Sequence, residues 1–399
     1  PKLVKAGLRV AICDQLEDPK MTKTIVKRGV TELVTPGVAI NDEVLQSKSN
    51  NFLASIYFSK TTNGIAFLDV STGEYLVAQG NDEYIDKLLQ NFQPSEILIE
   101  KNSRNSFKEK FGSGFNTFFI EDWVFKEDYA FQTLTNHFQT KSLKGFGIED
   151  LPNGIIAAGA IMYYLSETQH NKIQHISNIQ RIAEDSYVWM DKFTIRNLEL
   201  YHSNAQNAVT LLDVIDKTLS PMGSRLLKRW LALPLKDMVK IRNRHEVVAY
   251  FKDNQEILKQ IQYQIKQISD LERLISKLAT GKISPREVIY LKDSLDAIIP
   301  IKTLALESKQ DAVRVIGDSL HACELLRKKI KTTLNPDAPV AISKGNAIAV
   351  GVHQELDELR TIAFSGKEFL ENIEKRESER TGISSLKISF NNVFGYYIE

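Results

Sequence analysis

Cysteine is nearly absent from the chain, and long apolar runs are missing. Only two of the 399 residues are cysteines, Cys13 and Cys323, which excludes a disulfide scaffold and a cysteine-based zinc site. No run approaches the roughly 18 apolar residues of a membrane-spanning helix. The N-terminal PKLVKAGLRV does not have the pattern of a signal peptide. These absences predict a cytoplasmic location and no membrane partner.

Motifs for nucleotide and metal chemistry are also missing. The sequence contains no GxGxxG, HExxH, CxxC or GxSxG. Gly281–Lys282 and Gly366–Lys367 lack both the earlier glycine and the following Ser or Thr of a P-loop. His170 and His175 lie in a polar segment without a cysteine or paired carboxylates nearby, which disfavours a metal role. We therefore predict no catalytic, cofactor-binding or metal-binding residue from these patterns.

The net charge of +1 conceals an asymmetry. Residues 51–200 carry 13 Lys/Arg against 19 Asp/Glu, whereas residues 201–399 carry 30 against 25. The excess in the second part fits either an ordinary surface or a face toward a polyanion, and alone it does not establish nucleic-acid binding.

The chain divides into three styles of sequence. Residues 1–50 predict a helix, a buried strand at Val10–Cys13 and an extended stretch. Residues 51–168 alternate short strands with helices at about 82–91, 107–111, 124–138 and 150–168, which predicts an α/β layer with a mixed sheet. Later residues predict helices at about 191–204, 219–232, 236–252, 254–267, 269–280, 285–297 and 317–333.

The last part of the chain predicts a long helix followed by a hairpin. A seam of small and large residues runs through 352–381, a rod of roughly 45 Å. The closing SLKISFNNVFGYYIE predicts two strands, the second unfinished. Because a lone hairpin is marginally stable, we expect Leu386–Glu399 to be poorly ordered or to borrow a neighbour's strand edge.

One constellation of carboxylates suggests an alternative function. Asp69 ends a strand where a three-stranded meander begins an α/β domain, as the metal-binding aspartate does in ribonuclease-H-like nucleases. Glu96, Glu100 and Asp122 are further candidates. An aspartate beside a turn is more often a turn residue, so the nuclease is the alternative hypothesis.

The segment Thr218–Asp237, TLSPMGSRLLKRWLALPLKD, predicts an amphipathic helix capped by Ser220 with Pro221 in the first position. We expect Leu226, Trp230 and their neighbours to pack inward. The face with Arg225, Lys228 and Arg229 is expected to be solvated. The segment also resembles the MutS mismatch-repair family, whose core contains MGxRxLxxWL-like sequences after an NLE-rich helix, here FTIRNLELYHSN.

Other pieces resemble the same family and keep its order. They are AICDQLEDP and LVTPG near the N-terminus, GFGIED, DLERLISKLATGKISPRE, ELDELR and the ERTGISSLKISFNNVFGYYIE ending. The resemblance implies a ribonuclease-H-like but non-catalytic connector, a helical core with levers and the start of a β clamp. The implied ranges are a mismatch-binding-domain remnant at 1–36, a linker at 37–50, the connector at 51–168, the core and lever at 169–384 and the clamp at 385–399.

The resemblance further implies partners and sites. The Phe-x-Glu wedge and the ATPase with its ATP and Mg²⁺ belong to the full-length family protein, before and after this segment, which implies no catalysis by the segment itself. Double-stranded DNA, a MutL-type repair partner and a second copy in a homodimer are the implied partners. Lys387, Asn391 and Asn392 are candidate contacts to the DNA backbone, and Gln132 is the candidate contact to the MutL-type protein.

Overall fold

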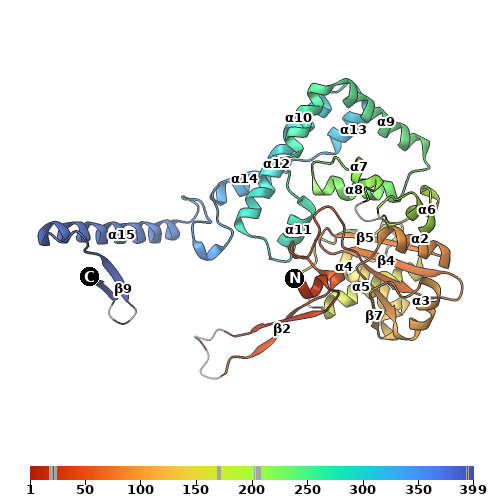
Figure 1. Cartoon of the computed structure of the whole chain (residues 1–399), viewed down its shortest axis with the longest axis horizontal. Helices are drawn as coiled ribbons and strands as arrows, with labels where there is room; N and C mark the ends of the chain where they lie inside the picture. Colours follow the sequence, from red (N-terminus) through yellow and green to blue (C-terminus); the bar gives the residue numbers. More distant parts are fainter. Residues whose placement is uncertain are drawn as a thin grey trace. The chain divides into compact units, whose positions relative to one another are not determined.

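The computed structural model describes residues 1–17, 21, 25–168, 172–201, 203, 208–391, 393 and 395–399. The chain forms two compact units, the first from Pro1–Ile283 with Tyr290–Cys323 and the second from Ser284–Ile289 with Glu324–Glu399 (Figure 1). None of the described helices is both long enough and apolar enough to span a membrane.

The first unit contains a six-stranded mixed sheet in the order β7-β6-β3-β4-β5-β8. We call it, with its helices, the α/β region. Strands β3, β4 and β5 form the predicted antiparallel meander, while β6, β7 and β8 join it in parallel. The strands are β3 (Leu53–Tyr57), β4 (Asn63–Asp69), β5 (Glu74–Gly80), β6 (Glu96–Glu100), β7 (Thr117–Ile120) and β8 (Gln180–Arg181).

Helices cover both faces of this sheet. In β4 every residue is buried, and alternate side chains enter two different apolar clusters: Ala66 and Leu68 one, Ile65 and Phe67 the other. The first cluster lies against α4 (Glu127–Phe138) and α5 (Pro152–Glu167), and the second against α2 (Asp82–Phe92) and α3 (Arg104–Phe111). The predicted α/β layer with a mixed sheet is therefore confirmed.

The ends of the layer helices follow local sequence signals. The Asn81 side chain accepts a hydrogen bond from the Tyr84 backbone N–H at 2.9 Å and caps α2. Pro152 occupies the first turn of α5. Short 3₁₀ turns complete the region: η2 (Lys101–Ser103), η3 (Asp122–Phe125) and η4 (Lys144–Phe146).

The N-terminal residues differ from the prediction of a buried strand. After α1 (Lys2–Lys5), β1 (Val10–Gln15) pairs antiparallel with β2 (Arg28–Val34), and most of β1 is exposed. The prediction for Val10–Cys13 was wrong because a two-stranded ribbon leaves its faces open to solvent. The turn η1 (Pro36–Val38) follows and is largely buried.

The rest of the first unit is helical (Figure 1). Its elements are η5 (Glu184–Ser186), α6 (Lys192–Asn197), α7 (Leu211–Ile215), α8 (Pro221–Ala232), α9 (Met238–Asp253), α10 (Gln255–Ile265), α11 (Leu271–Ala279), α13 (Asp311–Ser319) and, from Tyr290 onward, α12 (Pro285–Leu306). The helix predicted at 191–204 ends at Asn197, and the one predicted at 285–297 continues past Pro300 to Leu306.

The second unit contains α14 (Glu324–Thr333), η6 (Ile342–Lys344), α15 (Gln354–Thr381), β9 (Ile388–Asn391) and β10 (Gly395–Ile398). The helix predicted at 317–333 is confirmed over α14, but its start was wrong, because Leu320–Cys323 is not helical and Cys323 has a positive φ of 46°. The long helix is confirmed and ends at Gly382, whose φ is 75°. Strands β9 and β10 pair with each other. The expectation that Leu386–Glu399 is poorly ordered, or pairs with a strand of a neighbouring molecule, remains a prediction.

The contact between α4 and α5 yields a stability prediction. A Cβ added at Gly159 would lie 2.4 Å from the Ala130 Cβ, closer than two packed helices allow. Gly159→Ala should therefore lower the free energy of unfolding by about 1–3 kcal/mol, measured by urea denaturation followed by circular dichroism. Gly145→Ala, where a Cβ meets nothing within 4 Å, is the control. Equal stability of the two variants would mean that α4 moves aside at little cost.

Candidate functional site

The segment leaving the β1–β2 ribbon is attached to the α/β region through Glu96. The buried Glu96 carboxylate accepts hydrogen bonds from the Thr35 hydroxyl, from the Gly37 backbone N–H at 3.1 Å and from the Tyr164 hydroxyl at 2.7 Å. Burial, followed by the charge of Glu96, raises the pKa of Tyr164 well above its ordinary value, so the phenol remains a donor. These polar contacts fix the start of residues 37–50, which we call the linker, on the sheet.

Asp69 is a fully engaged turn residue. Its Oδ1 accepts from the Ser71 backbone N–H at 2.9 Å and hydroxyl at 2.7 Å, and its Oδ2 accepts from the Asn50 amide at 2.9 Å and the Asn51 backbone N–H at 3.1 Å. These bonds join the linker to the β4–β5 turn.

The other carboxylates of the nuclease alternative are engaged elsewhere. Glu96 holds the linker, Glu100 accepts from the Ser103 hydroxyl at 3.1 Å, and Asp122 accepts from the Asn102 amide. Within the described ranges, no group of three or more His, Cys, Asp or Glu residues could hold a metal ion. The geometry therefore does not support the nuclease alternative.

The basic side of α8 is turned into the protein, contrary to the prediction that it is solvated. Arg225 is only 3 % exposed, whereas Leu226 and Trp230 are 45 % and 41 % exposed. Burial lowers the pKa of Lys228. The correction has a physical reason: the acidic and carbonyl groups that Arg225 and Arg229 bind lie on the side of α8 that faces the linker and sheet.

Arg225 is the best-connected of these side chains. Its two Nη atoms each donate to one oxygen of Asp270 at 2.7 Å, and they also donate to Glu272 at 2.5 Å and to the Ser47 carbonyl at 2.8 Å. Burial opposes the charge, but the bonds to Asp270 and Glu272 outweigh it and raise the pKa of Arg225. The guanidinium thus stays charged inside the protein.

Two more arginines complete what we call the arginine junction, defined by Arg225, Arg229, Arg273 and the groups they bind. Arg229 pairs with Glu74 of β5. Arg273 of α11 donates to the carbonyls of Gln46 at 2.8 Å and Ser49 at 3.0 Å. The junction therefore joins helices α8 and α11 to the linker and the sheet.

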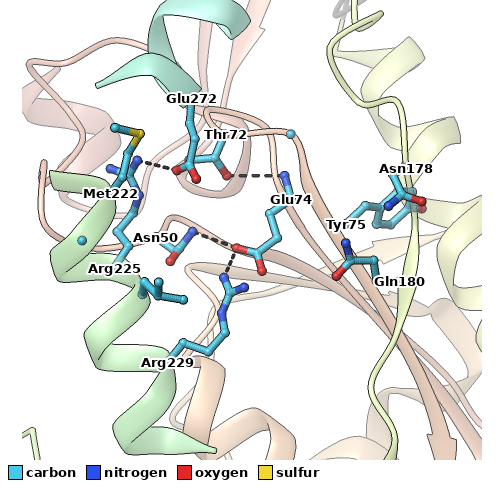
Figure 2. Close-up of a pocket in the computed structure, with 13 residues that line it drawn as sticks. Asn50, Thr72, Glu74, Tyr75, Asn178, Gln180, Met222, Arg225, Arg229 and Glu272 are labelled. Carbon is cyan, nitrogen blue, oxygen red and sulfur yellow. Dashed lines mark hydrogen bonds and ion pairs between the residues drawn. The ribbon is translucent and has the colours of Figure 1, made fainter. Parts of the chain in front are cut away.

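A cavity of about 420 Å³ lies within the junction. Figure 2 shows Arg225 and Arg229 extending from α8 toward Glu272 and Glu74, with Asn50 bonded to Glu74. Burial raises the pKa of Glu74, and Arg229 opposes the shift. The lining residues are Asn50, Thr72, Gly73, Glu74, Tyr75, Asn178, Gln180, Met222, Gly223, Arg225, Leu226, Arg229 and Glu272.

Asp216 supports α8 from the preceding loop. It accepts from the Ser224 hydroxyl at 2.6 Å, the Thr218 hydroxyl at 2.5 Å and backbone N–H at 3.1 Å, and Lys48 at 3.3 Å. Burial opposes ionisation, but these donors prevail and hold the pKa of Asp216 well below its ordinary value. Lys48 makes this carboxylate a further link between linker and helices.

None of the sites predicted from sequence is among the residues that form the junction. Gln132 is exposed on α4. Lys387 is exposed beside β9, where its backbone pairs with Glu399 in both directions at 2.8 Å. The Asn391 side chain accepts from the Val393 N–H at 2.7 Å, as a turn residue does. Asn392 and His170 lie outside the described residues. His175 binds the Val70 carbonyl at 2.7 Å.

The arginine junction itself was missed from the sequence. Arg225 and Arg229 are four residues apart and so share a helix face. A basic helix face of this kind can be exposed to solvent or can bind acidic residues, and the spacing does not distinguish the two. The acidic partners are distant in sequence, Asp270 by 45 positions and Glu74 by 155 positions. The available signal was the pair of acidic residues at the start of DLERL, Asp270 and Glu272. They were not identified from the sequence as partners of α8.

Comparisons with known proteins identify the family. Models of MutS domains I, II and III match residues 1–43, 51–179 and 193–387, in that order. The chain belongs to the MutS family. Relatives called DNA mismatch repair protein MutS are 79 % identical in Flavobacterium johnsoniae, 67 % in Christiangramia forsetii and 56 % in Parabacteroides distasonis, each over all of this chain. The chain spans about half the length of these relatives, 46 % in each case.

The arginine junction predicts a large effect of a single truncation. Arg225→Met takes the bidentate donor from Asp270, which is 16 % exposed, and one donor from the Ser47 carbonyl, and should cost about 1–3 kcal/mol of unfolding free energy, measured by urea denaturation. Arg314→Met removes an exposed pair with Asp311 and should cost no more than about 1 kcal/mol. A loss below about 1 kcal/mol for Arg225→Met would contradict the structural role assigned to this guanidinium.

Asp216 predicts a pH dependence with a definite sign. Its folded pKa is lower than the unfolded value of about 3.9, so its ionised form stabilises the fold above that pH, and the contribution is lost as the pH falls toward the folded pKa. Asp216→Asn should therefore cost about 1–3 kcal/mol at pH 6, and the cost should shrink between pH 4 and pH 2. Urea midpoints at each pH measure it. The same cost at pH 6 and pH 2.5 would count against the assignment.

Proposed function

We propose that this chain is the coupling segment of a DNA mismatch recognition and repair protein. It connects the mismatch-binding domain and the DNA-gripping clamp with the ATPase of the full-length protein and transmits conformational change between them. The observation that carries the proposal is the arginine junction, where Arg225 and Arg273 bind backbone carbonyls at Ser47, Gln46 and Ser49. Because the linker backbone is bonded to α8 and α11, a displacement of the linker also moves these helices.

The domain assignment belongs to the same proposal. The α/β region is the ribonuclease-H-like connector at 51–168, residues 169–384 are the helical core and lever, and 385–399 begin the clamp. The ranges 1–36 and 37–50 are the remnant of the mismatch-binding domain and the linker. This segment does not catalyse; ATP and Mg²⁺ act in the full-length protein, which works as a cytoplasmic homodimer.

DNA contact is assigned to the β9–β10 hairpin. Lys387 is exposed beside β9 and its ammonium group can pair with a phosphate. The Asn391 side-chain oxygen Oδ1 accepts a hydrogen bond within the turn. Its side-chain NH₂ group is then the donor for a phosphate oxygen. Contacts of this type position a protein on DNA without reading its sequence.

The partner-binding surface is assigned to α4. Gln132 is exposed on that helix, and the apolar residues Ala130 and Leu134 of the same helix are buried against the core. A helix anchored in this way presents its outer side as a rigid surface. We assign this surface to the MutL-type repair partner.

The proposal predicts weak, salt-sensitive DNA binding by this chain. Affinity for a duplex, measured by fluorescence anisotropy between 50 and 200 mM salt, should be independent of sequence and equal for matched and mismatched duplexes. Lys387→Ala should reduce the slope of log affinity against log salt by about one, whereas Lys387→Arg should keep it. Tight mismatch-specific binding by this chain alone would refute the proposed division of function.

A further inference from the structure

A half-exposed tryptophan lies beside two partly buried tyrosines on the α/β region. Trp123 of η3 is 50 % exposed. Tyr129 of α4 and Tyr163 of α5 meet it edge to face, with ring centroids 5.1 Å and 5.2 Å from that of Trp123 and interplanar angles of 75° and 78°. We call these three residues the aromatic platform. Exposed tryptophan and tyrosine clusters are typical of binding surfaces.

The platform is held rigidly. Tyr129 and Tyr163 also contact each other, with centroids 6.3 Å apart at 71°. The residues after Trp123, Val124 and Phe125, are buried in the core of the α/β region. A ring fixed by two others and by a buried neighbouring chain loses little conformational entropy on binding.

The surroundings of the platform are acidic. Glu167 follows Tyr163 by four residues on α5, so the two lie on the same side of that helix, and burial, followed by the charge of Glu167, raises the pKa of Tyr163. Glu121 is paired with Lys101, and Glu127 and Asp128 are exposed at the start of α4. Such a rim attracts a cation and repels a phosphate.

Lysines and arginines both lie over aromatic rings in the described part of the chain, and the two shortest of these contacts are made by arginines. Arg244 lies 3.5 Å from the centroid of Trp230, and Arg9 lies 3.7 Å from that of Phe118. Among the residues that the structure describes, no cation lies over Trp123. A guanidinium gains both from stacking on an indole face and from nearby carboxylates.

We propose that the aromatic platform docks an arginine side chain from a basic segment of a partner protein. The guanidinium lies against the exposed part of the Trp123 indole, and Glu167, on the same helix side as Tyr163, supplies a carboxylate for its N–H groups. Tyr129 precedes Gln132 by three residues on α4, so the two lie on neighbouring positions of one helix side. The inference rests on the proposed function in that it specifies how the partner is held beside Gln132.

The experiment measures binding of a hexa-arginine peptide to the full chain at low salt by calorimetry. Trp123→Ala should weaken binding about fivefold, Trp123→Phe should retain part of it, and Glu167→Gln should weaken it about twofold. Tyr263→Ala is the matched control, because Tyr263 is a 64 % exposed aromatic residue on α10 without this rim. A hexa-citrulline peptide, nearly isosteric but uncharged, should not bind.

The outcomes separate this inference from the proposed function. Equal arginine affinity of the wild type and of both Trp123→Ala and Glu167→Gln overturns the inference, as does equal binding of hexa-citrulline. Binding of an oligothymidine that depends on Trp123 and exceeds arginine binding also overturns it. If Gln132→Ala weakens binding of a purified MutL-type protein while Trp123→Ala leaves it unchanged, the inference fails and the proposed partner surface stands. If that protein does not bind at all but arginine binding needs Trp123, the partner assignment fails and the platform stands.

Discussion

The buried guanidinium of Arg225 sets the condition that the first unit of the structure must satisfy. A charge removed from water costs several kcal/mol unless charges and hydrogen bonds replace its hydration. Asp270 supplies a bidentate partner, and Glu272 and the Ser47 carbonyl supply the rest. Because Ser47 belongs to the linker and Asp270 caps the start of α11, one side chain fixes the path of the linker and the position of a helix together. Neither can move away without exposing or stranding the charge.

The same condition explains why polar rather than apolar groups make this contact. Arg229 and Glu74 pair beside the cavity, while the apolar Leu226 and Trp230 of the same helix stay partly exposed. Paired buried charges add little net stability but tolerate few alternative geometries. A contact of this kind holds two regions in one arrangement and can be released by losing a few specific bonds. Those properties suit a segment that couples regions, whereas an apolar core would resist any rearrangement.

Sequence patterns predicted the elements whose determinants are local. The meander around β4, the helix predicted at 150–168 and the long helix predicted at 352–381 follow from alternation and helical periodicity within those segments, and the structure has them as β3–β5, α5 and α15. The direction of α8 could not be predicted in this way. Its apolar side matches a buried face by periodicity, yet the long-range acids that bind Arg225 and Arg229 decide which side is buried. The break at Leu320–Cys323 also escaped prediction, because no glycine or proline marks it.

The surroundings of the three tryptophans differ in ways that the sequence does not predict. Each lies in a segment of mixed polar and apolar residues. In the structure, Trp189 donates its indole N–H to the Glu184 carbonyl at 2.6 Å and meets Tyr84 edge-on, and Trp230 carries the guanidinium of Arg244. Trp123 meets Tyr129 and Tyr163 at steep interplanar angles and is half exposed. Because Arg244 of this chain stacks on Trp230, an arginine of another protein can stack on Trp123 in the same way.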